Sequence, residues 1–198
     1  MGGANQHYER AFESYLTRSK IPHVLVDDVK RAVLPAGAKL SCGTASGDDV
    51  KIKSFDAVVY GDYAGRGRHL LVEVKGRRVD LRKGGSGRRE SWTTADDVAS
   101  LIAWERLFGE PFEGVLLFLY WLEGPSVNAM ERETFRFEGR VYAHRAVRLR
   151  EYMRRMRVRS PRWGTVNLGS DDFDAVSEPL ERLLRSGAAP VACGGPAA

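Results

Sequence analysis

The sequence predicts a mixed α/β protein in which helices pack on a β-sheet. Three observations lead to this fold class. The first residues have apolar side chains at helical spacing, later short runs resemble strands, and residues 115–122 form an apolar run typical of a central strand buried on both faces. The elements follow in the order helix, three strands, helix, strand, hairpin and helices, which favours helices layered on a mixed sheet.

The first twenty residues predict an amphipathic helix that ends before Pro22. An amphipathic helix places its apolar residues three or four positions apart, so that they share one face. The apolar residues at this spacing are Tyr8, Ala11, Phe12, Tyr15 and Leu16.

Three strands are expected to follow this helix, at residues 23–26, 51–60 and 69–75. The second and third of these are joined by a glycine-containing segment at 61–67. We therefore expect them to form an antiparallel hairpin.

The second helix has clear boundary signals. Thr94 is a suitable N-cap for a helix over 95–108, and Gly109 follows the last apolar residue. The remaining expected elements are a hairpin of 134–137 and 141–144 around Glu138-Gly139, a helix at 148–157, a strand at 165–168 and a last helix at 171–185.

Composition excludes several classes of protein. No segment approaches the 18 or more apolar residues of a membrane-spanning helix, and the start at 1–9 is polar, which indicates a cytoplasmic protein. Cys42 and Cys193 are too few for a disulfide framework. The loop expected at 76–90 has no phosphate-binding glycine motif, which argues against a nucleotide cofactor.

The chain of 198 residues suits one domain, which we expect to span 1–185. A basic helical extension is expected from about residue 145. The tail at 186–198 is rich in Gly, Ala and Pro without an apolar period, so we expect it to be disordered.

The net charge of +5 is unevenly distributed. Residues 75–89 contain seven basic side chains and one acid, and residues 145–162 contain eight arginines and one acid. The rest of the chain has 16 basic and 24 acidic residues, so the positive field is confined to these two segments. This pattern is typical of a surface that binds a polyanion, although a solvated charged surface has the same composition.

Nine residues of these two segments are candidates for contacts with nucleic-acid phosphates. In the helix expected at 148–157, an apolar stripe of Leu149, Met153 and Met156 should dock on the protein and leave the arginines around the exposed sides. The nine candidates are Arg77, Arg78, Arg82, Lys83, Arg148, Arg154, Arg155, Arg157 and Arg159.

Three charged residues in apolar strands form the most informative pattern. Glu73 and Lys75 alternate with valines, so both side chains point to the same face of their strand. Asp56 is the single acid of the preceding strand, and the expected hairpin can bring it near Glu73. Two converging carboxylates repel each other unless a hard cation such as Mg²⁺ binds both, although a buried ion pair with Lys75 would explain the pattern equally well.

Asp56 followed by Glu73-Val74-Lys75 resembles the PD-(D/E)XK nuclease superfamily, in particular its resolvase-like branch. The resemblance implies a restriction-endonuclease-like mixed β-sheet flanked by helices. It also implies that Asp56 and Glu73 hold Mg²⁺ or Mn²⁺ and that Lys75 positions the attacking water. Phe55 stands where the superfamily motif has proline.

The first helix adds a further acid to this resemblance. Members of the superfamily often supply a metal-binding glutamate from this helix, and Glu9 matches that position, with Glu13 as the second candidate. The segment His7-Tyr8-Glu9-Arg10-Ala11-Phe12-Glu13 also resembles the signature of the HYExAFE family of uncharacterised bacterial proteins. Whether His7 or Glu13 assists the site stays open.

The sequence therefore favours a Mg²⁺-dependent endonuclease that hydrolyses phosphodiester bonds of DNA, either duplex or junction. The expected catalytic residues are Asp56, Glu73, Lys75 and Glu9. Two alternatives remain: a nucleic-acid-binding module without cleavage, and a subunit of a DNA repair or defence complex. RNA is not excluded as a partner, and a homodimer is expected only from the resemblance.

Overall fold

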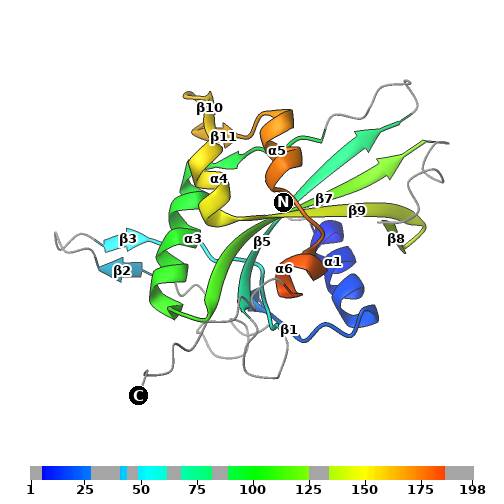
Figure 1. Cartoon of the computed structure of the whole chain (residues 1–198), viewed down its shortest axis with the longest axis horizontal. Helices are drawn as coiled ribbons and strands as arrows, with labels where there is room; N and C mark the ends of the chain where they lie inside the picture. Colours follow the sequence, from blue (N-terminus) through cyan, green and yellow to red (C-terminus); the bar gives the residue numbers. More distant parts are fainter. Residues whose placement is uncertain are drawn as a thin grey trace, which may run out of the picture.

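The protein is described here from a computed structural model, which places residues 6–27, 41–43, 49–61, 68–81, 89–124 and 134–185. Its main feature is a six-stranded mixed sheet (Figure 1). In spatial order the strands are β1 (His23–Leu25), β4 (Ala57–Val59), β5 (His69–Asp80), β7 (Phe112–Glu123), β9 (Arg140–Arg148) and β8 (Thr134–Phe137).

The two longest strands, β5 and β7, lie side by side at the centre of the sheet and are parallel, whereas every other pair in the sheet is antiparallel. Residues 113–120 of β7 are all buried, as expected for a strand covered on both faces. The register pairs Glu73 with Leu116 and Lys75 with Phe118. Glu73 and Lys75 therefore lie beside the most apolar strand of the protein.

Helices cover both faces of this sheet. On one face, α1 (Gln6–Arg18) and α6 (Leu180–Arg185) pack against alternate strand residues such as Leu70 and Val72. On the other face, α3 (Ala95–Phe108), α4 (Leu149–Arg155) and α5 (Ser170–Val176) pack with residues such as Leu71 and Phe118. Figure 1 shows the two groups of helices on opposite sides of the strands. This arrangement confirms the expected fold class, a mixed α/β sheet flanked by helices.

Two smaller sheets complete the fold. In the first, β10 (Arg157–Ser160) pairs with β11 (Thr165–Asn167), which pairs with β6 (Thr93–Thr94) just before α3. In the second, β2 (Ser41–Gly43) pairs with β3 (Asp49–Lys51). Within the described ranges, no helix is long and apolar enough to span a membrane.

Several expected elements are confirmed with their boundaries. Helix α1 buries all five of its predicted apolar residues. Helix α3 has Thr94 as N-cap and Gly109 as C-cap. The hairpin of β8 and β9 turns at Glu138 and Gly139, which both have positive φ (45° and 73°), a conformation that glycine adopts without strain.

Other expected boundaries were wrong. The strand expected at 51–60 is two separate strands, β3 and β4, with no strand at 52–56. Strand β5 continues to Asp80, so the first part of the expected loop at 76–90 is strand, and residues 82–88 lie outside the described part. The last helix is divided into α5 and α6, since Pro179 disfavours helical backbone in the residue before it.

The expected basic helical extension also differs from the structure. Strand β9 runs to Arg148, so the helix begins at Leu149 and is followed at Arg157 by a strand, not by more helix. Leu149 is buried as expected, but Met153 and Met156 are exposed. The buried partner of Leu149 is Tyr152, whose hydroxyl donates to carbonyl oxygens on two neighbouring segments. The tail at 186–198 lies outside the described residues.

Candidate active site

Asp56 lies at the entry to β4 and is fixed to β5 by two hydrogen bonds. Its backbone N–H donates to the Val72 carbonyl (3.0 Å), and its carboxylate Oδ2 accepts from the Val74 backbone N–H (2.6 Å). Antiparallel pairing of Ala57 with Val72 sets this register. The hairpin therefore brings Asp56 beside the strand that carries Glu73.

Glu73 and Lys75 project from the same face of β5, as the alternation of strand residues requires. Both side chains are largely buried, and Lys75 Nζ donates to Glu73 Oε1 at 2.8 Å. This is the face that α3 covers. Lys75 therefore extends toward the N-terminal end of that helix.

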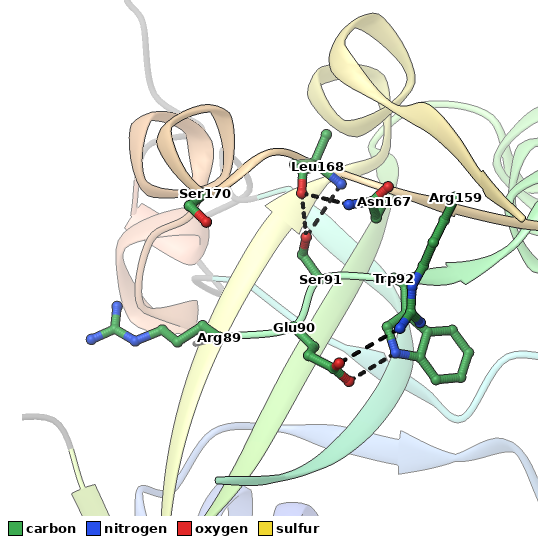
Figure 2. Close-up of a pocket in the computed structure, with 8 residues that line it drawn as sticks. All are labelled: Arg89, Glu90, Ser91, Trp92, Arg159, Asn167, Leu168 and Ser170. Carbon is green, nitrogen blue, oxygen red and sulfur yellow. Dashed lines mark hydrogen bonds and ion pairs between the residues drawn. The ribbon is translucent and has the colours of Figure 1, made fainter. Parts of the chain in front are cut away.

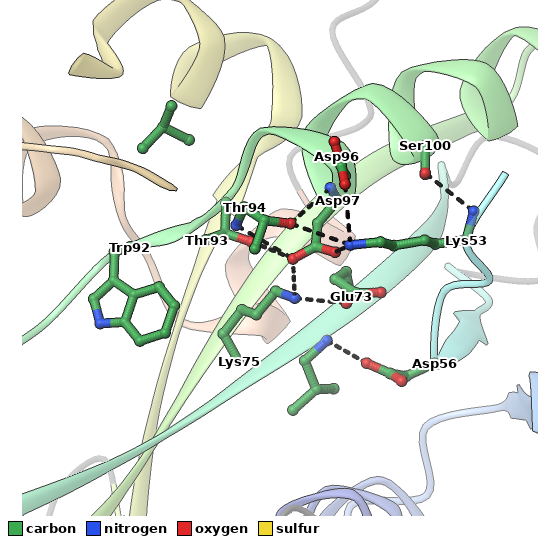
Figure 3. A network of polar contacts seen from close by, with 12 residues as sticks. Lys53, Asp56, Glu73, Lys75, Trp92, Thr93, Thr94, Asp96, Asp97 and Ser100 are labelled. Carbon is green, nitrogen blue, oxygen red and sulfur yellow. Dashed lines mark hydrogen bonds and ion pairs between the residues drawn. The ribbon is translucent and has the colours of Figure 1, made fainter. Parts of the chain in front are cut away.

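Asp97, in the first turn of α3, is the second partner of Lys75 (Figure 3). Its Oδ2 lies 2.6 Å from Lys75 Nζ, and its Oδ1 lies 3.0 Å from Lys53 Nζ. The Asp97 carboxylate also accepts from the Thr94 backbone N–H, while Thr94 Oγ1 accepts from the Asp97 N–H, which completes a capping box. One residue thus both caps α3 and holds the lysine of the site.

Asp97 did not emerge from the sequence as a site residue. The only available signal was the spacing of Thr94 and Asp97, and that spacing indicates a helix start rather than a partner for Lys75. The contact between Asp97 and Lys75 depends on how α3 packs over β5. Local sequence does not specify this packing.

A pocket of about 260 Å³ brings the predicted residues together. Glu9 lines it from α1. The neighbouring Tyr8 holds this helix close to β5, because its ring packs on Gly76, where the Cβ atom of any other residue would lie 2.2 Å from the ring. Glu13 does not line this pocket, and His7 Nδ1 is hydrogen-bonded to the Tyr142 hydroxyl (2.9 Å). The lining residues are Tyr8, Glu9, Asp56, Glu73, Val74, Lys75, Gly76, Arg77, Trp92, Thr93, Thr94 and Asp97.

Burial and mutual repulsion alter the protonation of the acids in this pocket. Burial, together with the charges of Glu73 and Glu9, raises the pKa of Asp56 to about 8, although the Val74 N–H and Lys75 oppose the shift. Burial also raises the pKa of Glu73, against the influence of Lys75, and burial and the nearby Asp27 raise the pKa of Glu9. The pocket therefore disfavours its own negative charges when no cation is bound.

Lys75 and Asp97 behave as an ion pair. Burial alone would lower the pKa of Lys75, but Glu73 and Asp97 outweigh it, so the pKa is raised. Burial alone would raise the pKa of Asp97, but Lys75, Lys53 and Thr94 hold it well below its usual value. Lys75 is therefore protonated at neutral pH and is a hydrogen-bond donor, not a base.

The donor set of the pocket fits a hard divalent cation. Its acids supply carboxylate oxygens, the ligands that Mg²⁺ and Mn²⁺ prefer, and a cation would relieve the repulsion that raises the pKa of Asp56. In the part of the chain that the structure describes, no three His, Cys, Asp or Glu side chains already lie close enough to form a complete metal site. Asp56 and Glu73 both line the pocket and interact electrostatically.

A second, smaller pocket of about 90 Å³ adjoins the first (Figure 2). Trp92 lines both pockets. The Arg77 guanidinium lies 3.9 Å from the centre of the Trp92 ring, and that of Arg159 lies 5.0 Å from it. The indole Nε1 donates to Glu90 (2.9 Å). The second pocket is lined by Arg89, Glu90, Ser91, Trp92, Arg159, Asn167, Leu168 and Ser170.

The predicted phosphate-binding residues occupy different environments. Arg148 is only 12% exposed and forms an ion pair with the buried Glu113. The other described candidates besides Arg77 are more exposed and contact surface carboxylates. These pairs are Arg78 with Glu123, Arg154 and Arg155 with Glu151, Arg157 with Asp172, and Arg159 with Glu90. Arg82 and Lys83 lie outside the described residues.

We compared the chain with protein families, curated proteins and solved structures. No family model matches it, so the resemblance to the HYExAFE family gains no support. No curated protein matches it either. Among solved structures, it is similar to the 1.6 Å structure of Archaeoglobus fulgidus Hjc, a Holliday junction resolvase from an archaeal hyperthermophile, at 16% identity and a TM-score of 0.46, covering 86% of this chain and 93% of that one.

Proposed function

We propose that this protein is a metal-dependent nuclease of the PD-(D/E)XK type that hydrolyses phosphodiester bonds of DNA. One observation carries the proposal. Asp56, Glu73 and Lys75 line one pocket together with Glu9, and burial and mutual repulsion raise the pKa of Asp56 to about 8. Perturbed acids that converge with a lysine in a cleft are typical of a catalytic site.

Each residue has a distinct role in this proposal. Asp56 and Glu73 would hold Mg²⁺ or Mn²⁺, with Glu9 as an additional oxygen ligand from α1. The cation supplies Lewis-acid activation of water and of the phosphate. Lys75, which is protonated, donates a hydrogen bond to the attacking water and offsets the negative charge that develops on the phosphate. Asp97 positions Lys75 and is not assigned as a metal ligand, because Lys53 and Lys75 already neutralise its carboxylate.

One observation favours the alternative of a binding module without cleavage. Lys75 Nζ is already paired with two carboxylates, Glu73 and Asp97, and Glu73 would have to share its oxygens between Lys75 and a cation. A non-catalytic protein could use Glu73, Lys75 and Asp97 as a structural ion-pair network. Cleavage assays on single variants separate the two functions.

The test is cleavage of labelled duplex, four-way junction, single-stranded DNA and RNA of matched sequence, with Mg²⁺, Mn²⁺ or EDTA. We expect cleavage of at least one DNA with either metal and none in EDTA. Asp56→Asn, Glu73→Gln and Lys75→Met should each lower the rate at least about 100-fold, the range for loss of a principal charge-stabilising group. Glu13→Gln, on the same helix as Glu9 but outside the pocket, is the matched control and should retain full activity.

Two results would contradict the proposal. One is the absence of metal-dependent cleavage on every substrate, with DNA binding retained, which would identify a binding module. The other is cleavage that persists in Asp56→Asn or Glu73→Gln, which would place the chemistry elsewhere. Light scattering on the same preparations tests the homodimer that the resemblance implies.

A further inference from the structure

The hairpin of β10 and β11 presents an exposed tryptophan at its turn. Trp163 is 70% exposed and Val158 is 69% exposed, and these are the two most exposed large apolar side chains among the residues that the structure describes. The turn is defined, because the Gly164 N–H donates to the Pro161 carbonyl (3.2 Å) and Gly164 has a φ of 55°. Packing within the protein therefore does not explain why a large aromatic residue stands at position 163.

The surroundings of Trp163 are strongly basic. The Arg162 guanidinium lies 5.3 Å from the centre of the indole ring. Arg157 and Arg159 belong to β10, and Arg154 lies near the end of α4 just before it. The carboxylates that contact these arginines are partly exposed and can exchange them for other anions at little cost, because surface ion pairs contribute little. An exposed aromatic ring among arginines is the combination that binds unpaired nucleotides, the bases by stacking and the backbone by charge.

The hairpin is rigidly connected to the candidate active site. Thr165 and Val166 of β11 pair with Thr94 and Thr93, which line the pocket, and the Gly164 carbonyl accepts from the Ala95 N–H (2.8 Å). These contacts fix the hairpin at the N-terminal end of α3. Any substrate in the pocket therefore lies at a set distance from the turn.

Arg159 provides a second connection, since its guanidinium lies against Trp92 at the boundary of the two pockets (Figure 2). Trp163 is four residues further along the chain, which spans at most about 14 Å. A nucleic-acid strand rises about 3.4 Å per nucleotide, so this upper limit corresponds to at most about four nucleotides. The tryptophan can therefore reach a base close to a phosphate bound in the first pocket.

We propose that Trp163 stacks on an unpaired base while the arginines of β10 contact the adjacent backbone, so that the hairpin selects DNA that has a single-stranded segment next to a duplex. The proposal rests on the proposed function only in assigning the first pocket to the scissile phosphate. Binding by the hairpin itself requires no cleavage. It adds a substrate class and a specificity-determining residue to the site.

The experiment measures binding of the full chain to two labelled DNAs in EDTA, where no metal-dependent cleavage occurs. One DNA is a blunt duplex, and the other is the same duplex with a single-stranded arm of about four nucleotides, the length that the hairpin can span. We expect Trp163→Ala to weaken binding of the armed duplex by about 5- to 150-fold, the range for loss of one base-stacking contact. Binding of the blunt duplex should change less than about twofold.

Two further variants control the measurement. Trp163→Phe keeps an aromatic face and should bind the armed duplex within a few fold of the wild type. Leu107→Ala removes another exposed apolar side chain, near the opposite end of α3 from β6, and should change neither affinity. Thermal melts establish that Trp163→Ala is folded, as its exposure predicts.

Three outcomes would overturn the proposal: unchanged binding of the armed duplex by Trp163→Ala, equal losses on both DNAs, or a change only in the oligomeric mass of the protein, which would make the hairpin a protein interface. Failure of the proposed function is distinguishable from these outcomes. A wild-type protein that prefers the armed duplex, loses this preference with Trp163→Ala and cuts nothing in Mg²⁺ would retain the hairpin assignment and lose the nuclease assignment.

Discussion

At the scale of single residues, the carboxyl groups of two aspartates in the site have pKa values shifted in opposite directions. Asp56 is buried beside other acids, which raises its pKa to about 8, whereas Asp97 lies between two lysines, which keep its pKa low. The difference comes from the charge of the nearest neighbours. Asp56 therefore destabilises the protein when ionised, and Asp97 stabilises it.

Asp56→Asn should stabilise the metal-free protein increasingly as pH rises. Unfolded Asp56 ionises near its ordinary pKa of 3.8, but folded Asp56 retains its proton until about pH 8. Between these values, raising the pH favours the unfolded wild type by up to about 1.4 kcal/mol per pH unit, and asparagine, which still accepts from the Val74 N–H, removes this dependence. The measurement is the free energy of urea unfolding in EDTA from pH 4.5 to 8.5.

The exposed Asp96 supplies the control for this pH series. Asp96→Asn removes the same charge from an exposed carboxylate and is the matched substitution with which the Asp56→Asn series is compared. A difference between Asp56→Asn and the wild type that stays constant with pH would show that Asp56 ionises normally in the folded protein. Repulsion from Glu73 and Glu9 would then be too weak to call for a cation.

At the scale of elements, the N-terminal end of α3 organises the site. Its first turn contains Asp97, which joins the capping box of the helix to Lys75 of β5. The residues just before it form β6, which pairs with β11. One short segment therefore connects the helix, the central sheet and the hairpin of β10 and β11.

Asp97→Ala should destabilise the protein by about 1–3 kcal/mol. The substitution removes one half of the capping box and one of the two carboxylates that pair with Lys75 among the described residues, which leaves Glu73. Buried charges that lose a partner are costly. Asp96→Ala is the matched control, because the Asp96 side chain is 81% exposed whereas that of Asp97 is 10% exposed. This substitution should lower the free energy of unfolding by less than about 0.5 kcal/mol. Chemical denaturation measures both, and equal effects would show that Asp97 is not a structural partner of Lys75.

The elements also show what the sequence could and could not predict. Strand alternation correctly placed Glu73 and Lys75 on one face of β5, because that face is a local property of extended backbone. The prediction that Leu149, Met153 and Met156 form the buried face of one helix was wrong. Tyr152 has an equally suitable helical spacing from Leu149 and is the residue buried with it, and the helix ends at Arg155, before Met156. The choice between such alternatives depends on tertiary packing, as does the contact of Asp97 with Lys75.

At the scale of the whole molecule, the arginines divide into a structural and a surface group. Arg148 neutralises the buried Glu113 between sheet and helices, so its substitution would affect folding. Arg154, Arg155 and Arg157 surround the end of α4 and the start of β10, and their carboxylate partners are partly exposed. The surface group is therefore the one that can exchange its partners for phosphates.

Replacing Arg154, Arg155 and Arg157 together by Gln should weaken DNA binding and make it less dependent on salt. Each phosphate contact contributes about 0.9 to the slope of log K against log salt on duplex DNA, so the slope should become shallower by about two to three units. Fluorescence anisotropy over a salt series, with thermal melts as a folding control, measures this change. Affinity and slope identical to the wild type would assign this face to solvent or to a protein partner.

The packing of α1 has a consequence for how the chain is synthesised. Helix α1 carries Glu9 and is made first, but its apolar face is closed by β9 and by α6, where the Tyr15 hydroxyl contacts Glu181. A nascent chain that has emerged only as far as α5 lacks the cover from α6, although Tyr8, next to Glu9, already has its packing partner on β5 at Gly76. The Tyr15 end of α1 is therefore completed last during synthesis, when α6 supplies Glu181.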